Sequence, residues 1–150
     1  MDSAVVRQKL ASIERCVRRI EACQARLARP GERIDDDLDA HDSVALNLVR
    51  AIGLCADVAL HLISGWSVET PSTMAASFEP LVSRGVLTHA VADELRRAVG
   101  FRNVVVHDYE AVDWALVLPV LDARLSLFKT FAASILRYEA TVSATSLAPK

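Results

Sequence analysis

The segment between Val44 and Ile63 constrains the fold more than any other part of the chain. Almost all of its residues are aliphatic or small, on every side of a helix. A helix that is apolar all round is usually central, packed by neighbouring helices or by a second subunit. Four polar side chains interrupt the segment: Asn47, Arg50, Asp57 and His61. These interruptions argue against a membrane span, which needs about 20 predominantly apolar residues.

The composition agrees with an all-helical domain built around that segment. Hydrophobic residues make up 52% of the 150 residues, and glycine and proline are limited to five each. A chain of this length is expected to form one domain with a buried core. We therefore predict a single all-α domain over residues 1–140. The small and polar residues 141–150 are expected to form a frayed tail.

Capping and breaking residues predict where the helices begin and end. We expect a first helix over residues 2–28, a second from the acidic run to residue 64, a short third over residues 72–84, a fourth opened by Thr88 and a last over residues 113–138. Ser72 is expected to cap the third helix, and Pro80 to kink it. Pro119 is expected to interrupt or bend the last helix.

The first predicted helix has one apolar side and one basic side. Its apolar side consists of Val6, Leu10, Ile13, Val17, Ile20 and Leu27. Its basic side consists of Arg15, Arg18, Arg19, Arg26 and Arg29, and an acidic run follows at residues 35–42. The net charge of −2 therefore hides a local basic surface. The simplest interpretation of that surface is an ordinary solvated helix face.

Most familiar enzyme signals are absent from the sequence. It has no glycine-rich phosphate loop of the GxGxxG or GxxxxGK[ST] type, no CxxC and no HExxH. The acidic run around His41 is interpreted as the start of a helix rather than as a cation site. The odd number of cysteines, three, favours reduced thiols. With no apolar leader segment, we expect a cytoplasmic protein with no cofactor, no metal ion and no membrane association.

The stretch from Gly100 to Tyr109, GFRNVVVHDY, places reactive side chains around three valines. Arg102 carries a permanent charge and a planar donor group suited to phosphate oxygens. His107 exchanges a proton near neutral pH. Such a pair suits RNA cleavage, in which histidine deprotonates a ribose 2′-hydroxyl and arginine stabilises charge on the adjacent phosphate. An exposed arginine beside a histidine that caps the helix end would leave the same pattern.

Helix geometry sets a condition on the hypothesis of RNA cleavage. On a continuous helix, residues five apart diverge by about 140°, so Arg102 and His107 would not face one point. Either the helix ends within the NVVV run, where β-branched residues favour it least, or two copies of the chain face each other. The valines are expected to pack the far side of the motif into the core.

The sequence RNVVVHDY resembles the R-x4-H-x-Y motif of the HEPN superfamily, and is most similar to its HepT-like toxin family. The sequence GFRN before the valines, the upstream helix AIGLCADVALHLIS and the basic first helix agree with that family. The similarity extends from about residue 36 to residue 138. Asp108 stands where many relatives have glutamate. The resemblance implies a HEPN-type up-and-down bundle of four to five helices.

The resemblance also implies a function, a metal-independent endoribonuclease toxin that acts as a homodimer with its active cleft at the interface. Arg102 and His107 would be the catalytic pair, and Asn103 would support them. Tyr109 would accept AMP from a nucleotidyltransferase antitoxin of the MNT type, and the added anion would compete with RNA phosphate. The implied substrate is RNA, with transfer RNA among the candidates. The basic side of the first helix would hold the RNA backbone or the acidic partner.

The polar side chains of the second helix fit two interpretations. They share one stripe, which is either the solvent edge of the helix or the lining of a cleft. In the second case Asn47, Asp57 and His61 are further candidate site residues.

Two alternatives for the whole protein also stay open. One is a non-catalytic HEPN module that binds the nucleotidyltransferase or a nucleotide. The other is a helical adaptor with a purely structural motif, in which substitutions of Arg102 and His107 would change stability rather than activity.

Overall fold

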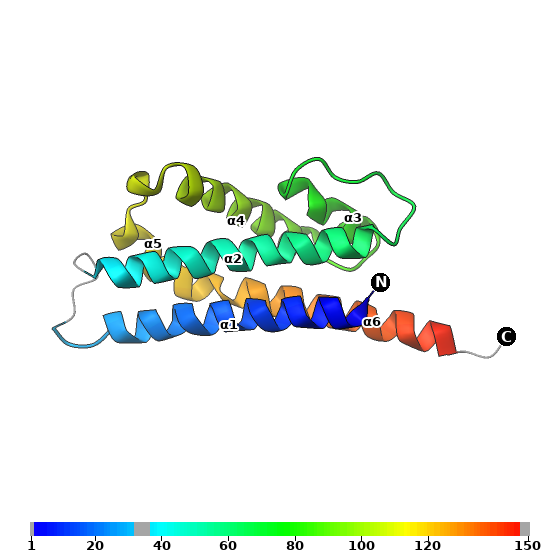
Figure 1. Cartoon of the computed structure of the whole chain (residues 1–150), viewed down its shortest axis with the longest axis horizontal. Helices are drawn as coiled ribbons and strands as arrows, with labels where there is room; N and C mark the ends of the chain where they lie inside the picture. Colours follow the sequence, from blue (N-terminus) through cyan, green and yellow to red (C-terminus); the bar gives the residue numbers. More distant parts are fainter. Residues whose placement is uncertain (1, 32–36, 148–150) are drawn as a thin grey trace.

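A computed structural model describes residues 2–31 and 37–147 as a bundle of up-and-down helices (Figure 1). In chain order these are α1 (Ser3–Leu27), α2 (Leu38–Ile63), the 3₁₀ turn η2 (Ala75–Phe78), α3 (Glu79–Ser83), α4 (His89–His107), the 3₁₀ turn η3 (Tyr109–Ala111), α5 (Trp114–Arg124) and α6 (Ser126–Leu147). Within those two ranges there is no strand. The prediction of an all-α fold is confirmed.

The apolar helix α2 is the central element of the bundle. Figure 1 shows it between α1 and α4. Buried side chains on several of its sides contribute to the core, including Val44, Leu48, Ile52, Cys55 and Leu62. By length and composition alone α2 could cross a membrane, but core helices pass the same test, and more than half of its most apolar window is buried in the bundle. The predicted central helix is confirmed.

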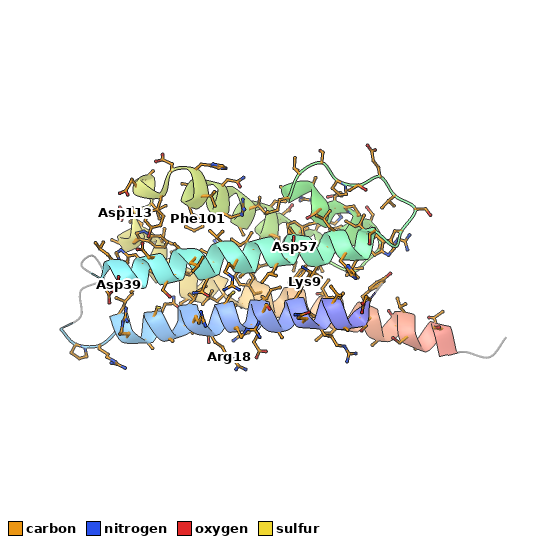
Figure 2. All side chains as sticks on the ribbon, in the orientation of Figure 1. Lys9, Arg18, Asp39, Asp57, Phe101 and Asp113 are labelled. Atoms are coloured by element: carbon orange, nitrogen blue, oxygen red, sulfur yellow. The ribbon has the colours of Figure 1, made fainter. Side chains whose placement is uncertain are left out.

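The first helix, α1, buries its apolar side and leaves most of its basic side outside. All six predicted apolar positions are buried: Val6, Leu10, Ile13, Val17, Ile20 and Leu27. Arg18 points away from the bundle (Figure 2) and pairs with Glu14 at 2.6 Å. Arg26 departs from the prediction, because its guanidinium pairs at 2.8 Å with Asp37, the N-cap of α2. The first part of the acidic run lies outside the described residues.

The segment before α4 differs from the predicted third helix. Thr73, not Ser72, accepts a hydrogen bond from the N–H of Ala76 at 3.1 Å, and the chain forms η2 before α3. Pro80 lies in the first turn of α3, where a missing N–H breaks no internal hydrogen bond, so it causes no kink. Gly85, with φ of 70°, ends this segment in a conformation that other residues rarely adopt.

Helix α4 places the motif from Arg102 to Tyr109 beside the start of α2. Thr88 caps it as predicted, with its Oγ1 accepting from the N–H of Val91 at 3.2 Å. Four buried side chains hold it in the bundle: Ala92, Leu95, Val99 and Val105. Gly100 does not interrupt the helix, which continues to His107. Because α4 runs antiparallel to α2 (Figure 1), its last turn lies near the first turns of α2.

The C-terminal helices correct two predictions. Pro119 lies inside α5, and the break falls later, at Leu125, where the N–H of Phe128 donates to the Leu125 carbonyl at 3.2 Å in a 3₁₀-type turn. Helix α6 extends through residues 141–147, beyond the predicted end of the last helix at residue 138. In this last part the hydroxyl of Thr145 donates a hydrogen bond to the Thr141 carbonyl at 2.9 Å. Residues 148–150 lie outside the described residues.

Candidate active site

The motif from Arg102 to His107 lies on one uninterrupted helix. Helix α4 extends to His107, and Asp108 ends it with φ of −147° and ψ of 60°. The helix therefore does not end within the NVVV run, and the alternative with two facing copies is the one that stays open. Residues five apart on a helix diverge by about 140°. One copy of the chain thus points Arg102 and His107 in different directions.

Only one of the three valines packs into the core. Val105 is 6% exposed, whereas Val104 is 45% and Val106 is 47% exposed. Three consecutive helical residues span about 200°, so they cannot all face the bundle, and the expectation that they do was wrong. Asn103, Val104 and His107 instead share the outward side of α4 within one turn. The end of α4 therefore presents apolar surface beside its polar groups.

Arg102 is half-buried and is held by its neighbour in the sequence. Its Nη1 donates to Oδ1 of Asn103 at 3.2 Å. Its Nε is buried and has no hydrogen-bond partner among the described residues. Arg102 lies one turn before Val105, on the same side of α4. The structure thus brings Arg102 and Asn103 together, and the asparagine orients a guanidinium whose planar fork suits phosphate oxygens.

A neighbouring groove does not include the motif. It has a volume of about 260 Å³, is largely apolar, and runs beside α4 along Phe101, Val117 and Val120. Arg102 and His107 are not among its lining residues. His107 is exposed at the end of α4. In one copy, therefore, this groove does not enclose the arginine and histidine together.

Tyr109 turns back onto α2 immediately after α4 ends. It begins η3, in which the N–H of Val112 donates to the Tyr109 carbonyl at 3.1 Å. Its hydroxyl donates to the carboxylate of Asp42, an exposed residue of α2. Its ring lies 6.0 Å from that of Trp114, which in turn stacks on His41 at 5.7 Å. The tyrosine is therefore fixed by its hydrogen bond to Asp42 and by aromatic packing.

Sequence reasoning missed the contact between Asp42 and Tyr109. The sequence pattern places Asp42 in the acidic run at the start of the second helix, but it is Asp37 that caps α2, by accepting from the N–H of Ala40 at 2.9 Å. Asp42 and Tyr109 are 67 residues apart in the chain, so no local spacing relates them. Helix order alone could have indicated the contact, since antiparallel packing places the end of α4 near the start of α2.

The environment of Tyr109 raises the pKa of its phenol from 10.0 to about 12. Burial is the largest cause, followed by the hydrogen bond to Asp42 and the negative charges of Asp42 and Glu110, while a hydrogen bond from Trp114 acts in the opposite direction. A raised folded-state pKa means that the protonated phenol stabilises the folded state at pH values below about 10. This contribution is lost as the pH rises through about 12.

We predict that Asp42→Asn lowers the pKa of Tyr109 without returning it to 10.0, because burial remains when the carboxylate charge is removed. The measurement is tyrosinate absorbance against pH in a Tyr138→Phe background, which leaves Tyr109 as the only tyrosine of the chain. In the Asp42→Asn variant, absorbance should rise at lower pH than in its parent. Identical titration curves would show that the Asp42 carboxylate does not act on this phenol.

Two of the candidate residues on α2 contact α1 or its N-cap instead of the motif. Asp57 pairs with Lys9 of α1 at 3.4 Å, and the two residues lie between the helices in Figure 2. His61 accepts a hydrogen bond from the backbone N–H of Asp2 at 3.2 Å. Asp57 is fifteen positions beyond Asp42, or about 22 Å along the helix. The structure therefore does not bring Asp57 or His61 to Tyr109.

Asn47 lies nearer to the start of α2 and is 2% exposed, so it is not on a solvent edge. Its Nδ2 donates to the carbonyl of Ser43 at 2.8 Å. Its Oδ1 is buried without a hydrogen-bond partner within the described ranges. Since α4 is antiparallel to α2 and Tyr109 contacts Asp42, Asn47 is roughly level with Arg102 along the bundle. Its role as a cleft residue stays a prediction.

Solved structures share this fold. A tri-AMPylated HEPN toxin of Shewanella oneidensis, in complex with MNT antitoxin, is 31% identical, with a TM-score of 0.80 over 91% of this chain and 99% of that chain. A toxin–antitoxin structure with AMP-PNP is 30% identical, with a TM-score of 0.80 over 90% and 99% of the two chains. YutE of Bacillus subtilis, at 17% identity and a TM-score of 0.76 over 100% and 96%, shows the fold alone. The fold is that of a HEPN-type helical bundle.

The sequence comparisons identify the family within that class. The family model described as "Ribonuclease HepT-like" matches residues 13–135. An mRNA nuclease HepT of Shewanella oneidensis is 32% identical over 127 residues, which cover 85% of this chain and 92% of that protein. The chain therefore belongs to the HepT-like ribonuclease family.

Proposed function

We propose that this chain is a ribonuclease toxin of the cytoplasm, active as a homodimer and neutralised by a nucleotidyltransferase antitoxin that attaches AMP to Tyr109. The observation that carries the proposal is the R-x4-H-x-Y sequence at the end of α4, in a bundle with a TM-score of 0.80 to an AMPylated HEPN toxin. The 32% identity to an mRNA nuclease supports RNA as the substrate.

In the proposed reaction His107 is the general base. Its imidazole removes the proton from a ribose 2′-hydroxyl, whose oxygen attacks the adjacent phosphorus. The bond to the 5′-oxygen of the next nucleotide breaks, leaving a 2′,3′-cyclic phosphate and a 5′-hydroxyl end. Arg102, oriented by Asn103 at 3.2 Å, stabilises the charge that builds on the phosphate oxygens. These side chains supply both functions, so the reaction as proposed needs no metal ion.

The proposed homodimer follows from what one copy lacks. Arg102 and His107 diverge by about 140° on α4, so in one chain the two side chains point in different directions. Two copies packed around the outward side of α4 would face their motifs toward a common cleft. The exposed Val104 supplies apolar surface for that packing. Such a cleft holds two His107 side chains, one to accept a proton and one to return a proton to the leaving oxygen.

The proposed regulation uses the position of Tyr109. It follows His107 by two residues, and its ring and hydroxyl are anchored on α2 and Trp114. An AMP on this hydroxyl adds a phosphodiester charge and a nucleoside beside the end of α4. The added anion competes with the RNA phosphate for Arg102 and blocks access to His107.

Expression of the chain alone is expected to arrest the growth of a bacterial host, and co-expression of the cognate nucleotidyltransferase to restore it. The Tyr109→Phe variant should stay toxic in the presence of the partner, because it has no hydroxyl to modify. Tyr138→Phe, which removes the other tyrosine, is the matched control and should be neutralised normally. Neutralisation of the Tyr109→Phe variant as efficient as that of the wild type would contradict Tyr109 as the regulatory acceptor.

A further inference from the structure

The hydroxyl of Tyr109 is already hydrogen-bonded to a potential proton acceptor of the same chain. Its Oη donates to the carboxylate of Asp42, which reaches it from α2, 67 residues earlier in the sequence. The packing of Trp114 against the Tyr109 ring, with ring centres 6.0 Å apart, restricts the direction of the phenol. Asp42 is exposed, so a proton that it accepts can pass to water.

We propose that Asp42 is the general base for the transfer of AMP to Tyr109, so that the toxin supplies part of the chemistry of its own neutralisation. This inference rests on the proposed modification of Tyr109. Oη of Tyr109 attacks the α-phosphorus of an ATP held by the partner enzyme, and a new oxygen–phosphorus bond forms. The bond from that phosphorus to the bridging oxygen breaks, and pyrophosphate leaves. The phenolic proton moves to the Asp42 carboxylate and then to water.

The state of the phenol before reaction requires such a base. With its pKa raised to about 12, Tyr109 keeps its proton at neutral pH, so the proton must leave during the attack. A group that removes this proton must lie within hydrogen-bond reach of Oη. Asp42 meets that condition in the free toxin, before any partner binds. Glu110 follows Tyr109 in the chain and acts on it through its charge rather than through a hydrogen bond.

The hydrogen bond to Tyr109 distinguishes Asp42 from Asp37 and Asp39, the neighbouring acidic residues at the start of α2. Asp37 is engaged as the N-cap and in the pair with Arg26. Asp39 is exposed in the first turn, three residues before Asp42. Residues three apart on a helix differ in direction by about 60° and in height by about 4.5 Å. Asp39 therefore offers a matched control, because it is a carboxylate on the same helix that makes no hydrogen bond with Tyr109 among the described residues.

The test measures AMP transfer to the purified full-length toxin by its cognate nucleotidyltransferase, with ATP labelled at the α-phosphate and the partner in excess. The rate constant is followed at several partner concentrations, which separates the maximal rate from binding. We expect Asp42→Asn to lower the maximal rate by at least about 100-fold, the typical size of a general-base contribution. The half-saturating partner concentration should stay within about twofold, since the neutral amide keeps the shape of the side chain.

Two further variants sharpen the result. Asp42→Glu keeps a carboxylate that can act as a general base. Its maximal rate of AMP transfer is expected to be at least about tenfold higher than that of Asp42→Asn. Asp39→Asn should transfer at the wild-type rate. Helicity measured by circular dichroism shows that each variant is folded, and Asp42→Ser repeats the carboxylate removal with a smaller side chain. A merely structural role for Asp42 would not predict recovery by a longer acid.

The outcomes distinguish a failure of the role of Asp42 from a failure of the proposed modification of Tyr109. If the wild type is labelled at Tyr109 and Asp42→Asn is labelled at the same maximal rate, the partner provides the base and the inference about Asp42 fails alone. A change confined to the half-saturating partner concentration also overturns it, because it assigns Asp42 to docking. If the wild type is not labelled, or Tyr109→Phe is labelled equally well, the proposed modification of Tyr109 fails and the inference fails with it.

Discussion

Replacing His107 with alanine is expected to lower RNA cleavage by at least about 100-fold, because the proposed reaction loses the group that removes the 2′-hydroxyl proton. The folded state should be little affected, since His107 is exposed at the last position of α4. The measurement is the rate of cleavage of a labelled RNA by purified, unmodified protein, with circular dichroism and thermal unfolding recorded on the same samples.

His89→Ala is the matched control for the His107 substitution. His89 is exposed at the first position of the same helix, at the opposite end from the motif. The same change of residue type there should leave the cleavage rate at the wild-type value. Cleavage by His107→Ala at the wild-type rate would remove this histidine from the reaction. A large loss of thermal stability in that variant would favour instead the interpretation of the motif as a structural element.

Replacing Val104 with lysine is the second large effect that we expect. Val104 is 45% exposed on the side of α4 that carries Asn103 and His107, where the proposed interface lies. In a two-fold interface each substitution occurs twice, so two ammonium groups would lose solvent and repel each other. The dimer should weaken by at least about 100-fold, and cleavage should fall in parallel as the shared cleft is lost.

Lysine is chosen because its charge attracts RNA, so that loss of cleavage cannot be attributed to repulsion of the substrate. The stability of the monomer should change by no more than about 0.5 kcal/mol, as for other surface substitutions. Val68→Lys is the control, since Val68 is 44% exposed in the segment that follows α2. Sedimentation gives the assembly state of each variant. A monomeric Val104→Lys protein that cleaves at the wild-type rate would contradict a site shared between copies.

The order of the helices could be predicted from the sequence because its signals are local. In α1 the apolar spacing is that of one buried side, and Thr88 caps α4 where the sequence indicated. The effects of the prolines were less predictable, since they depend on the turn that each occupies. Pro80 falls in a first turn, where it is tolerated, and Pro119 lies inside α5 while the break occurs at Leu125.

The candidate site could be predicted in part. The motif indicated Arg102, His107 and Tyr109, and the spacing of the first two indicated that one continuous helix would separate them. The exposure of Val104 and Val106 follows from the same helical geometry, but only once the helix is known to continue through them. No local pattern pairs Asp42 with Tyr109, because their contact depends on how α4 lies along α2.

The assignment of Asp57 and His61 to a cleft illustrates the same limit. The two residues do share one stripe of α2, as the helical spacing indicated. Which neighbour that stripe faces is decided by the packing of the bundle, and at this end of α2 the neighbour is α1. A helical pattern therefore predicts which residues lie together on a side of a helix, but not what they contact.

The most decisive experiment measures the cleavage of total and transfer RNA by the purified, unmodified protein in the presence of EDTA. We expect cleavage that survives chelation, is lost in His107→Ala, and leaves 2′,3′-cyclic phosphate and 5′-hydroxyl ends. Intact RNA in both pools, with a folded and unmodified protein, would contradict the ribonuclease mechanism. That result would favour a HEPN module that binds its nucleotidyltransferase partner without cleaving RNA.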